Sequence, residues 1–133
     1  MKKFFFSTKQ HFSDIGLLIL RVAAGAMMMT HGYAKLDNFS TLKDVFGDPI
    51  GLGPFVSLLL TIFAEFICSI LVMVGFATRF ALIPLIITMV VAVFVVHGGD
   101  PFAKKELGLI YLSMYGTLML LGPGKLSIDN MIK

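Results

Sequence analysis

Hydrophobic residues in this chain are gathered into four long runs, separated by shorter polar segments. The runs cover approximately residues 15–33, 55–74, 80–96 and 104–121. A helix that crosses a bilayer needs about 20 mostly apolar residues, with a range of about 17–25. The fourth run is uninterrupted only from Leu107 to Leu121, so we expect its helix to begin nearer Ala103 or to lie where the bilayer thins. The pattern predicts four membrane-spanning helices.

The connections between the runs contain residues that break helices. The first, "LDNFSTLKDVFGDPIGLGP", is rich in Asp, Asn, Gly and Pro, whereas "GFATRF" and "HGGDPFAKKE" are short. Short connections place consecutive helices side by side and antiparallel. We therefore predict an all-α fold, with residues 1–133 forming a single domain that is an antiparallel, up-and-down four-helix transmembrane bundle.

The composition agrees with this pattern. Hydrophobic residues make up 57% of the chain, charged residues 14%, and the mean hydropathy is +0.91; soluble domains average about 45–50% apolar and about 25% charged residues. The expected class is therefore an integral membrane protein, with the lipid bilayer as its first partner. No basic stripe interleaved with aromatic residues is present, so no nucleic-acid partner is expected. The one cysteine, Cys68, excludes an internal disulfide or a cysteine-based metal cluster, and no metal site is predicted.

The positive residues near the ends of the runs predict the orientation. Lysine and arginine are slightly more frequent in the N-terminal segment, the second connection and the tail than on the opposite side. Because cytoplasmic segments carry the excess of these residues, both termini are expected in the cytoplasm. The N-terminus starts with basic residues, but Arg21 interrupts its apolar core, so we interpret it as a retained first helix and not as a cleaved signal.

Two ionisable residues fall inside the predicted spans. Arg21 lies six residues into the first span, and Glu65 lies near the middle of the second, which runs the other way. At about 1.5 Å of rise per residue, their heights differ by about 4 Å, which an arginine side chain can bridge. A charge in hydrocarbon is costly unless it is paired. We therefore predict that Arg21 and Glu65 form an intramembrane polar pair, which either fixes helix registry or serves a substrate or proton.

A second group of polar residues is predicted at the outer mouth of the bundle, where the first and third spans both end. The group comprises His31, Lys35, His97, Asp100, Glu106 and Tyr111. Three interpretations are open. The residues are ordinary interfacial residues, or they form a pocket for a small polar-headed lipophile such as a quinone. In the third interpretation, for which two histidines near span ends are weak support, His31 and His97 ligate a haem.

Longer blocks of the sequence resemble a known family. The blocks are "LLILRVAAGAMMMTHGYAKLDNF", "FAEFICSILVMVGFATRFALIPL", "VVHGGDPF" and "KKELGLIYLSMYGTLMLLGPGKLSID". Together, from about Ile15 to Asp129, they resemble the DoxX family. The likeness rests on the arginine of the first span, the "HGYAKL" ending, the mid-span glutamate, the "GFATR" turn, the late histidine and "GPGKLSID".

This resemblance implies a bacterial inner-membrane protein. The family is named for a small membrane subunit of an archaeal thiosulfate:quinone oxidoreductase, and other members are linked to membrane-associated redox or detoxification complexes. The positions that match the family's polar positions are Arg21, His31, Lys35, Glu65, His97 and Glu106.

Three functions follow from these observations. The resemblance favours a membrane subunit of a quinone-linked or redox and detoxification complex, with a redox partner protein and a quinone as the candidate cofactor. The alternatives are a lipid- or lipophile-binding or transport protein with a polar intramembrane site, and a non-catalytic membrane scaffold. The sequence leaves open whether the chain is an enzyme by itself, and a homo-oligomer is compatible with all three functions.

Overall fold

The computed structural model describes residues 2–133, and this part of the chain is helical without any strand. Three short helices are α1 (Lys2–Phe5), α3 (Phe39–Leu42) and α8 (Ile128–Ile132). The long elements are α2 (Ser13–Asp37), the continuous rod of α4 (Pro54–Ile62), η1 (Phe63–Cys68) and α5 (Ser69–Val74), the rod of α6 (Thr78–Val91) and η2 (Ala92–Val96), and α7 (Phe102–Leu121). The predicted all-α class is confirmed.

Three of the long elements have the length and composition of membrane spans. They are Ser13–Asp37, Pro54–Val74 and Thr78–Val96. The remaining long helix, α7, has 20 residues, but every 18-residue stretch within it contains Lys104, Lys105 and Glu106. Three spans are therefore supported by composition, and the predicted fourth span stays a prediction. Apolar helices of this kind indicate association with membrane lipid.

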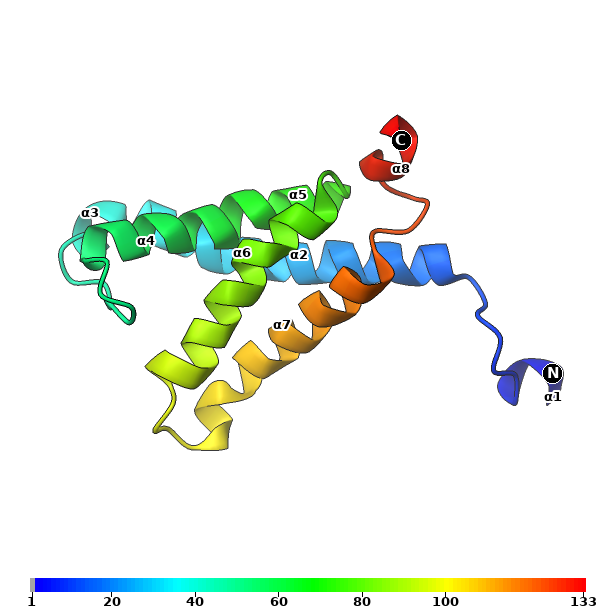
Figure 1. The fold of residues 1–133 in the computed structure, drawn as a ribbon, viewed down its shortest axis with the longest axis horizontal. Coiled ribbons are helices and arrows are strands. Elements are labelled where there is room, and N and C mark those ends of the chain that lie inside the picture. The colour runs from blue at the N-terminus through cyan, green and yellow to red at the C-terminus, as the bar shows by residue number, and fades with distance from the viewer. Residues whose placement is uncertain (1) are drawn as a thin grey trace.

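The long helices are arranged as two antiparallel pairs. In one pair α2 packs along the rod of α4, η1 and α5; in the other, α6 and η2 pack against α7. The pairs meet at α5 and η1 and diverge towards α4 and towards the loop that precedes α7, and both chain termini lie at the end where the pairs meet (Figure 1). We call this end the closed end and the other the open end.

The first pair is held together by a close approach of two backbones. Gly25 and Gly32 of α2 are both buried against the second rod. A Cβ atom added to Gly32 would lie 2.6 Å from the backbone carbon of Glu65 and from the backbone nitrogen of Phe66. Small residues permit such contacts between membrane helices. The contact places α2 directly beside Glu65.

The outer surface carries many large apolar side chains. Phe80, Phe94 and Leu120 expose 79%, 63% and 82% of their surface, while Leu82 and Tyr115 are fully buried. Large exposed apolar side chains spread over several long helices suit contact with lipid tails. This surface supports the assignment to a membrane.

The tail, residues 122–133, folds back onto the turn between α5 and α6. The Asp129 carboxylate accepts hydrogen bonds from the backbone N–H groups of Ala77 (2.7 Å) and Thr78 (2.9 Å) and from the Thr78 hydroxyl (2.8 Å). The Asp129 N–H in turn donates to the carbonyl of Gly75 over 2.8 Å. The first N–H groups of a helix lack acceptors within that helix. Asp129, near the C-terminus, provides acceptors for those at the start of α6. The segments "GFATR" and "GPGKLSID" are therefore one structural unit.

The fold should depend on the ionisation of Asp129. Burial acts to raise the pKa of this carboxyl, but hydrogen bonds from Thr78 and Ala77 and the charge of Arg21 together hold the pKa below its usual value of 3.8. Because the folded pKa is the lower one, the carboxylate stabilises the fold above pH 3.8, and this stabilisation is lost as the pH falls through the folded pKa. We expect Asp129→Asn to be less stable at pH 7 and to lose less on acidification. Thermal unfolding between pH 3 and 7 measures this.

The matched control for Asp129 is Asp44→Asn, because Asp44 is an exposed loop residue. Its unfolding curve should follow that of the parent at every pH. Parallel curves for the parent and Asp129→Asn would contradict the assigned role of the carboxylate.

Candidate functional site

Two π-helical segments mark the region where the helix pairs diverge. Glu65 lies in η1, and η2 ends just before His97, whose N–H donates to the carbonyl of Ala92 over 3.0 Å. In a π-helix the hydrogen bonds skip one more residue than in an α-helix, and such turns occur frequently at functional sites. Both segments contribute residues to the lining of two cavities.

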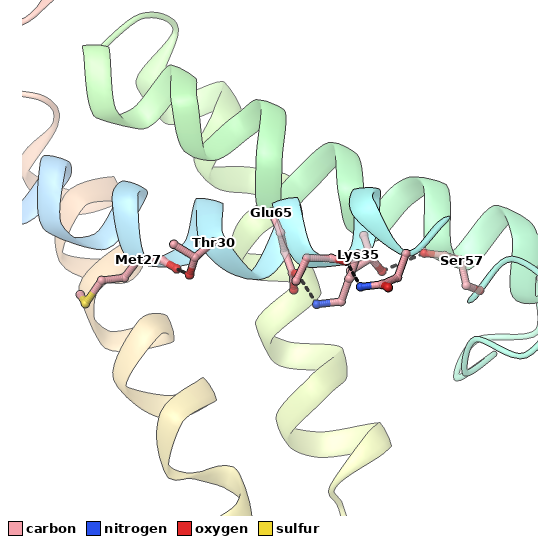
Figure 2. A network of polar contacts seen from close by, with 8 residues as sticks. Met27, Thr30, Lys35, Ser57 and Glu65 are labelled. Carbon is pink, nitrogen blue, oxygen red and sulfur yellow. Dashed lines mark hydrogen bonds and ion pairs between the residues drawn. The ribbon is translucent and has the colours of Figure 1, made fainter. Parts of the chain in front are cut away.

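An ion pair joins α2 to η1. The Lys35 ammonium donates to Oε1 of Glu65 over 2.6 Å, and the two side chains are 24% and 7% exposed. Lys35 follows Gly32 by about one helical turn, so the close backbone contact at Gly32 brings the ammonium within reach of Glu65. Figure 2 shows the lysine side chain extending from α2 to the carboxylate. A buried carboxylate is costly unless it is paired, and Lys35 is its partner.

The predicted pair of Arg21 and Glu65 is wrong. The Arg21 guanidinium is 1% exposed and donates to four backbone carbonyls. The acceptors are Val72 (3.0 Å) and Met73 (3.2 Å) at the end of α5, and Pro123 (2.6 Å) and Leu126 (3.0 Å) in the tail. The last carbonyls of a helix lack partners within it, and Arg21 supplies those partners at the closed end.

The error lies in the assumed alignment of the two helices. The sequence estimate took the apolar edges of the spans as a common reference height. In the structure Gly32 is opposite Glu65, and Arg21 precedes Gly32 by eleven residues, or about 16 Å along the helix axis. Arg21 is therefore level with the end of α5, and Glu65 belongs with the outer group of residues.

The first cavity near Glu65 is the histidine cavity, with a volume of about 230 Å³. Its polar lining residues are His31, Glu65, His97, Lys104, Lys105 and Tyr111. His31 packs edge-on against Tyr111 with 6.0 Å between ring centroids, and Tyr111 stacks on the buried Tyr115 at 5.9 Å. The cavity is a small aromatic chamber with cationic residues along its α7 side.

Several polar groups of the histidine cavity are free to bind a ligand. Nδ1 of His97 lies 2.8 Å from a carboxylate oxygen of Asp100, which leaves Nε2 of the ring available. Within residues 2–133, the His31 ring and the Tyr111 hydroxyl take part in no hydrogen bond. Together they offer donors and acceptors to an occupant of the cavity.

The second cavity is the apolar cavity, with a volume of about 350 Å³. It lies between α4, α6 and the loop of residues 46–52, and its lining includes Leu60, Ile87, Val91 and Val96. Glu65 and Ala92 line both cavities. The ion pair therefore lies where the two cavities adjoin.

The structure brings together most of the residues that were selected from the sequence for the outer group. His31, His97 and Tyr111 line the histidine cavity, Asp100 contacts His97, and Lys35 contacts Glu65. Glu106 is exposed and lines neither cavity. Whether these residues act as a functional site stays a prediction.

Two lysines of the site were not selected from the sequence. Lys104 and Lys105 line the histidine cavity beside Gly108 and Tyr111. Lys104, Gly108 and Tyr111 are spaced as residues on one face of a helix. Because Tyr111 was already a candidate, this spacing could have identified Lys104 as well. In residues 2–133 no group of three or more His, Cys, Asp or Glu side chains is placed to hold a metal ion.

Known proteins match this chain along much of its length. The DoxX family model matches residues 16–98. The protein named "Putative oxidoreductase CatD" of Bacillus subtilis (strain 168) is 30% identical over 120 residues, which cover 90% of this chain and 88% of that protein. An "Uncharacterized protein" of Haemophilus influenzae is 30% identical over 129 residues, covering 91% of this chain and 85% of its own length. No solved structure matches the chain significantly.

Proposed function

The chain belongs to the DoxX family, and from that membership and the histidine cavity we propose that it is a membrane subunit of a quinone-linked redox system. In this proposal the cavity binds the quinone ring, and a partner protein exchanges electrons with it. The chain is then a binding subunit and does not catalyse the reaction alone.

The histidine cavity is the observation that carries the proposal. A quinone ring presents two carbonyl oxygens that accept hydrogen bonds and an apolar, flat body. His31, Tyr111 and Lys104 provide donors along the cavity, and Met28 and Met89 provide apolar walls. Ligand pockets combine apolar walls with a few convergent polar groups in this way.

The size of the cavity favours a quinone ring over a haem. At about 230 Å³ it is smaller than the range of about 300–1,000 Å³ for drug-sized ligands. A single ring needs much less space than a macrocycle. We therefore assign His31 and His97 to hydrogen bonding with the ring.

The residues around the cavity also suit the protons of quinone chemistry. Reduction of a quinone to a quinol takes up two electrons and two protons. Glu65 and His97 in the cavity lining, and Asp100 beside His97, are groups that can accept or donate a proton. The name of the Bacillus subtilis relative, "Putative oxidoreductase CatD", is compatible with a redox role. We further propose the bacterial inner membrane as its location, with both termini in the cytoplasm.

Binding of a quinone ring tests the proposal. We expect the purified full-length chain in lipid nanodiscs to bind a short-chain ubiquinone analogue, and His31→Leu to weaken this binding at least tenfold because a hydrogen-bonding group is lost from the cavity. Isothermal titration measures the affinity. His11→Leu is the matched control, since His11 is exposed near the N-terminus and contacts Ser7. Equal affinity of the parent and His31→Leu, or no binding by either, would refute the proposal.

A further inference from the structure

We infer that the apolar cavity holds the hydrocarbon tail of the same ligand, so that one amphiphilic molecule occupies both cavities. Its polar head lies among the histidines, and its tail lies between α4 and α6. This inference rests on the proposed function for the identity of the head, but the tail site can be tested without a quinone.

The two cavities adjoin, as a ligand with a polar head in one and an apolar tail in the other requires. Glu65 and Ala92 line both cavities, one from η1 and the other from η2. Lys35 lines only the apolar cavity and reaches Glu65 over 2.6 Å. The ion pair therefore marks the boundary between a polar chamber and an apolar one.

The polar side chains of the apolar cavity already have hydrogen-bond partners. The Ser57 hydroxyl donates to the Asp48 carboxylate (3.2 Å), the Thr61 hydroxyl to the carbonyl of Ser57 (2.8 Å), and the Thr88 hydroxyl to the carbonyl of Pro84 (2.7 Å). A buried water molecule needs about two to four polar partners. With these groups engaged, the walls favour a hydrocarbon chain over ordered water.

Most of the apolar side chains that line the apolar cavity come from three elements, the loop of residues 46–52, α4 and α6. The loop contributes Phe46, Pro49, Ile50 and Leu52, and α4 and α6 contribute Leu60, Ile87 and Val91. Asp48 fastens this loop to the start of α4, because its carboxylate also accepts from the N–H of Gly53 over 2.9 Å. The loop thus forms part of the lining of the apolar cavity, and it lies at the open end of the bundle (Figure 1).

The test uses a photoreactive tail and a variant that fills the apolar cavity. Two probes carry a diazirine on a ten-carbon chain, one attached to a ubiquinone ring and the other a plain alcohol. The full-length chain in nanodiscs is illuminated with each probe, and the labelled residues are mapped by mass spectrometry. Thr61→Phe places a ring in the apolar cavity, and Thr88→Phe does so from the opposite wall. Thr117→Phe is the control, since Thr117 makes the same kind of hydroxyl contact, to the carbonyl four residues before it, at an exposed position of α7.

In the parent and in Thr117→Phe, we expect both probes to label the loop, Leu60, Ile87 and Val91. In Thr61→Phe or Thr88→Phe this labelling should fall at least tenfold. The same variants should leave the affinity for the short-chain ubiquinone analogue unchanged. In the parent the probe with a ten-carbon chain should bind more tightly than this analogue, and in the filling variants the two affinities should be equal. If the ring fails to bind but the alcohol probe labels these residues and the filling variants abolish that label, the tail site stands and the proposed function falls. Labelling that persists unchanged in both filling variants would overturn the inference.

Discussion

Replacing Gly32 with alanine is expected to destabilise the protein by about 2 kcal/mol. The new Cβ would lie 2.6 Å from backbone atoms of Glu65 and Phe66, and rigid backbone cannot move aside as a flexible side chain can. Overpacking of this kind costs about 1–3 kcal/mol and occasionally more. Alanine favours a helix over glycine by about 1 kcal/mol, but that gain is smaller than the cost of separating the two helices.

The measurement is the free energy of unfolding by SDS titration in mixed micelles. Gly16→Ala is the matched control, because Gly16 lies on the same helix with no atom within 4 Å of an added Cβ. That variant should be as stable as the parent or slightly more so. Equal stability of Gly32→Ala and Gly16→Ala would show that α2 and η1 are not in the close contact described here.

The same variant should also disturb the site. The Gly32 contact holds together the two helices that the ion pair of Lys35 and Glu65 joins. The fold and the ion pair are therefore linked through one residue without a side chain.

The sequence predicts the helices well because their signal is local. Runs of apolar residues broken by "GFATRF" and "HGGDPF" mark the rods to within a few residues. Gly25 and Gly32 of the first helix are small residues of the kind that permits a close neighbour, and both have one. These features depend on the spacing along one helix, which the sequence states directly.

The pairing of ionisable side chains is not predicted, because it depends on how far one helix is shifted along another. The apolar edges of the spans did not define that shift. An error of about two helical turns in the alignment placed Glu65 beside Arg21 instead of with the outer group of residues. The partners of Arg21 are backbone carbonyls, which every residue possesses and no sequence pattern marks. The π-helical turns at Glu65 and before His97 likewise leave no signal in the residue types.

Replacing Arg21 with alanine is the second change for which we expect a large effect. The guanidinium donates four hydrogen bonds to carbonyls of α5 and the tail. Hydrogen bonds to charged groups contribute about 1.5–3 kcal/mol each, although not additively. We therefore expect a loss of about 4 kcal/mol in the free energy of unfolding, measured by SDS titration. Arg21→Lys should recover only part of the loss, because an ammonium has three donors at one point and cannot match the planar fork.

The control for Arg21→Ala is Arg79→Ala. Arg79 also donates to carbonyls, at Met119 (2.9 Å) and Leu120 (3.3 Å), but it does so on the exposed surface. Its loss should cost about 1 kcal/mol or less, because water replaces the guanidinium there. Similar losses for both arginines would contradict the buried role of Arg21.

Double variants identify the partners of Arg21 independently of any structure. Arg21 and Glu65 share no partner, so the losses in Arg21→Ala and Glu65→Gln should add in the double variant. Arg21 and Asp129 both hold the tail against the turn after α5, and the charge of Arg21 acts on the pKa of the Asp129 carboxyl. Their double variant should therefore lose less than the sum of the single losses, since the first change already frees the tail. Additive losses with Asp129→Asn would contradict the shared hold of Arg21 and Asp129 on the tail. Non-additive losses with Glu65→Gln would contradict the separation of Arg21 from Glu65.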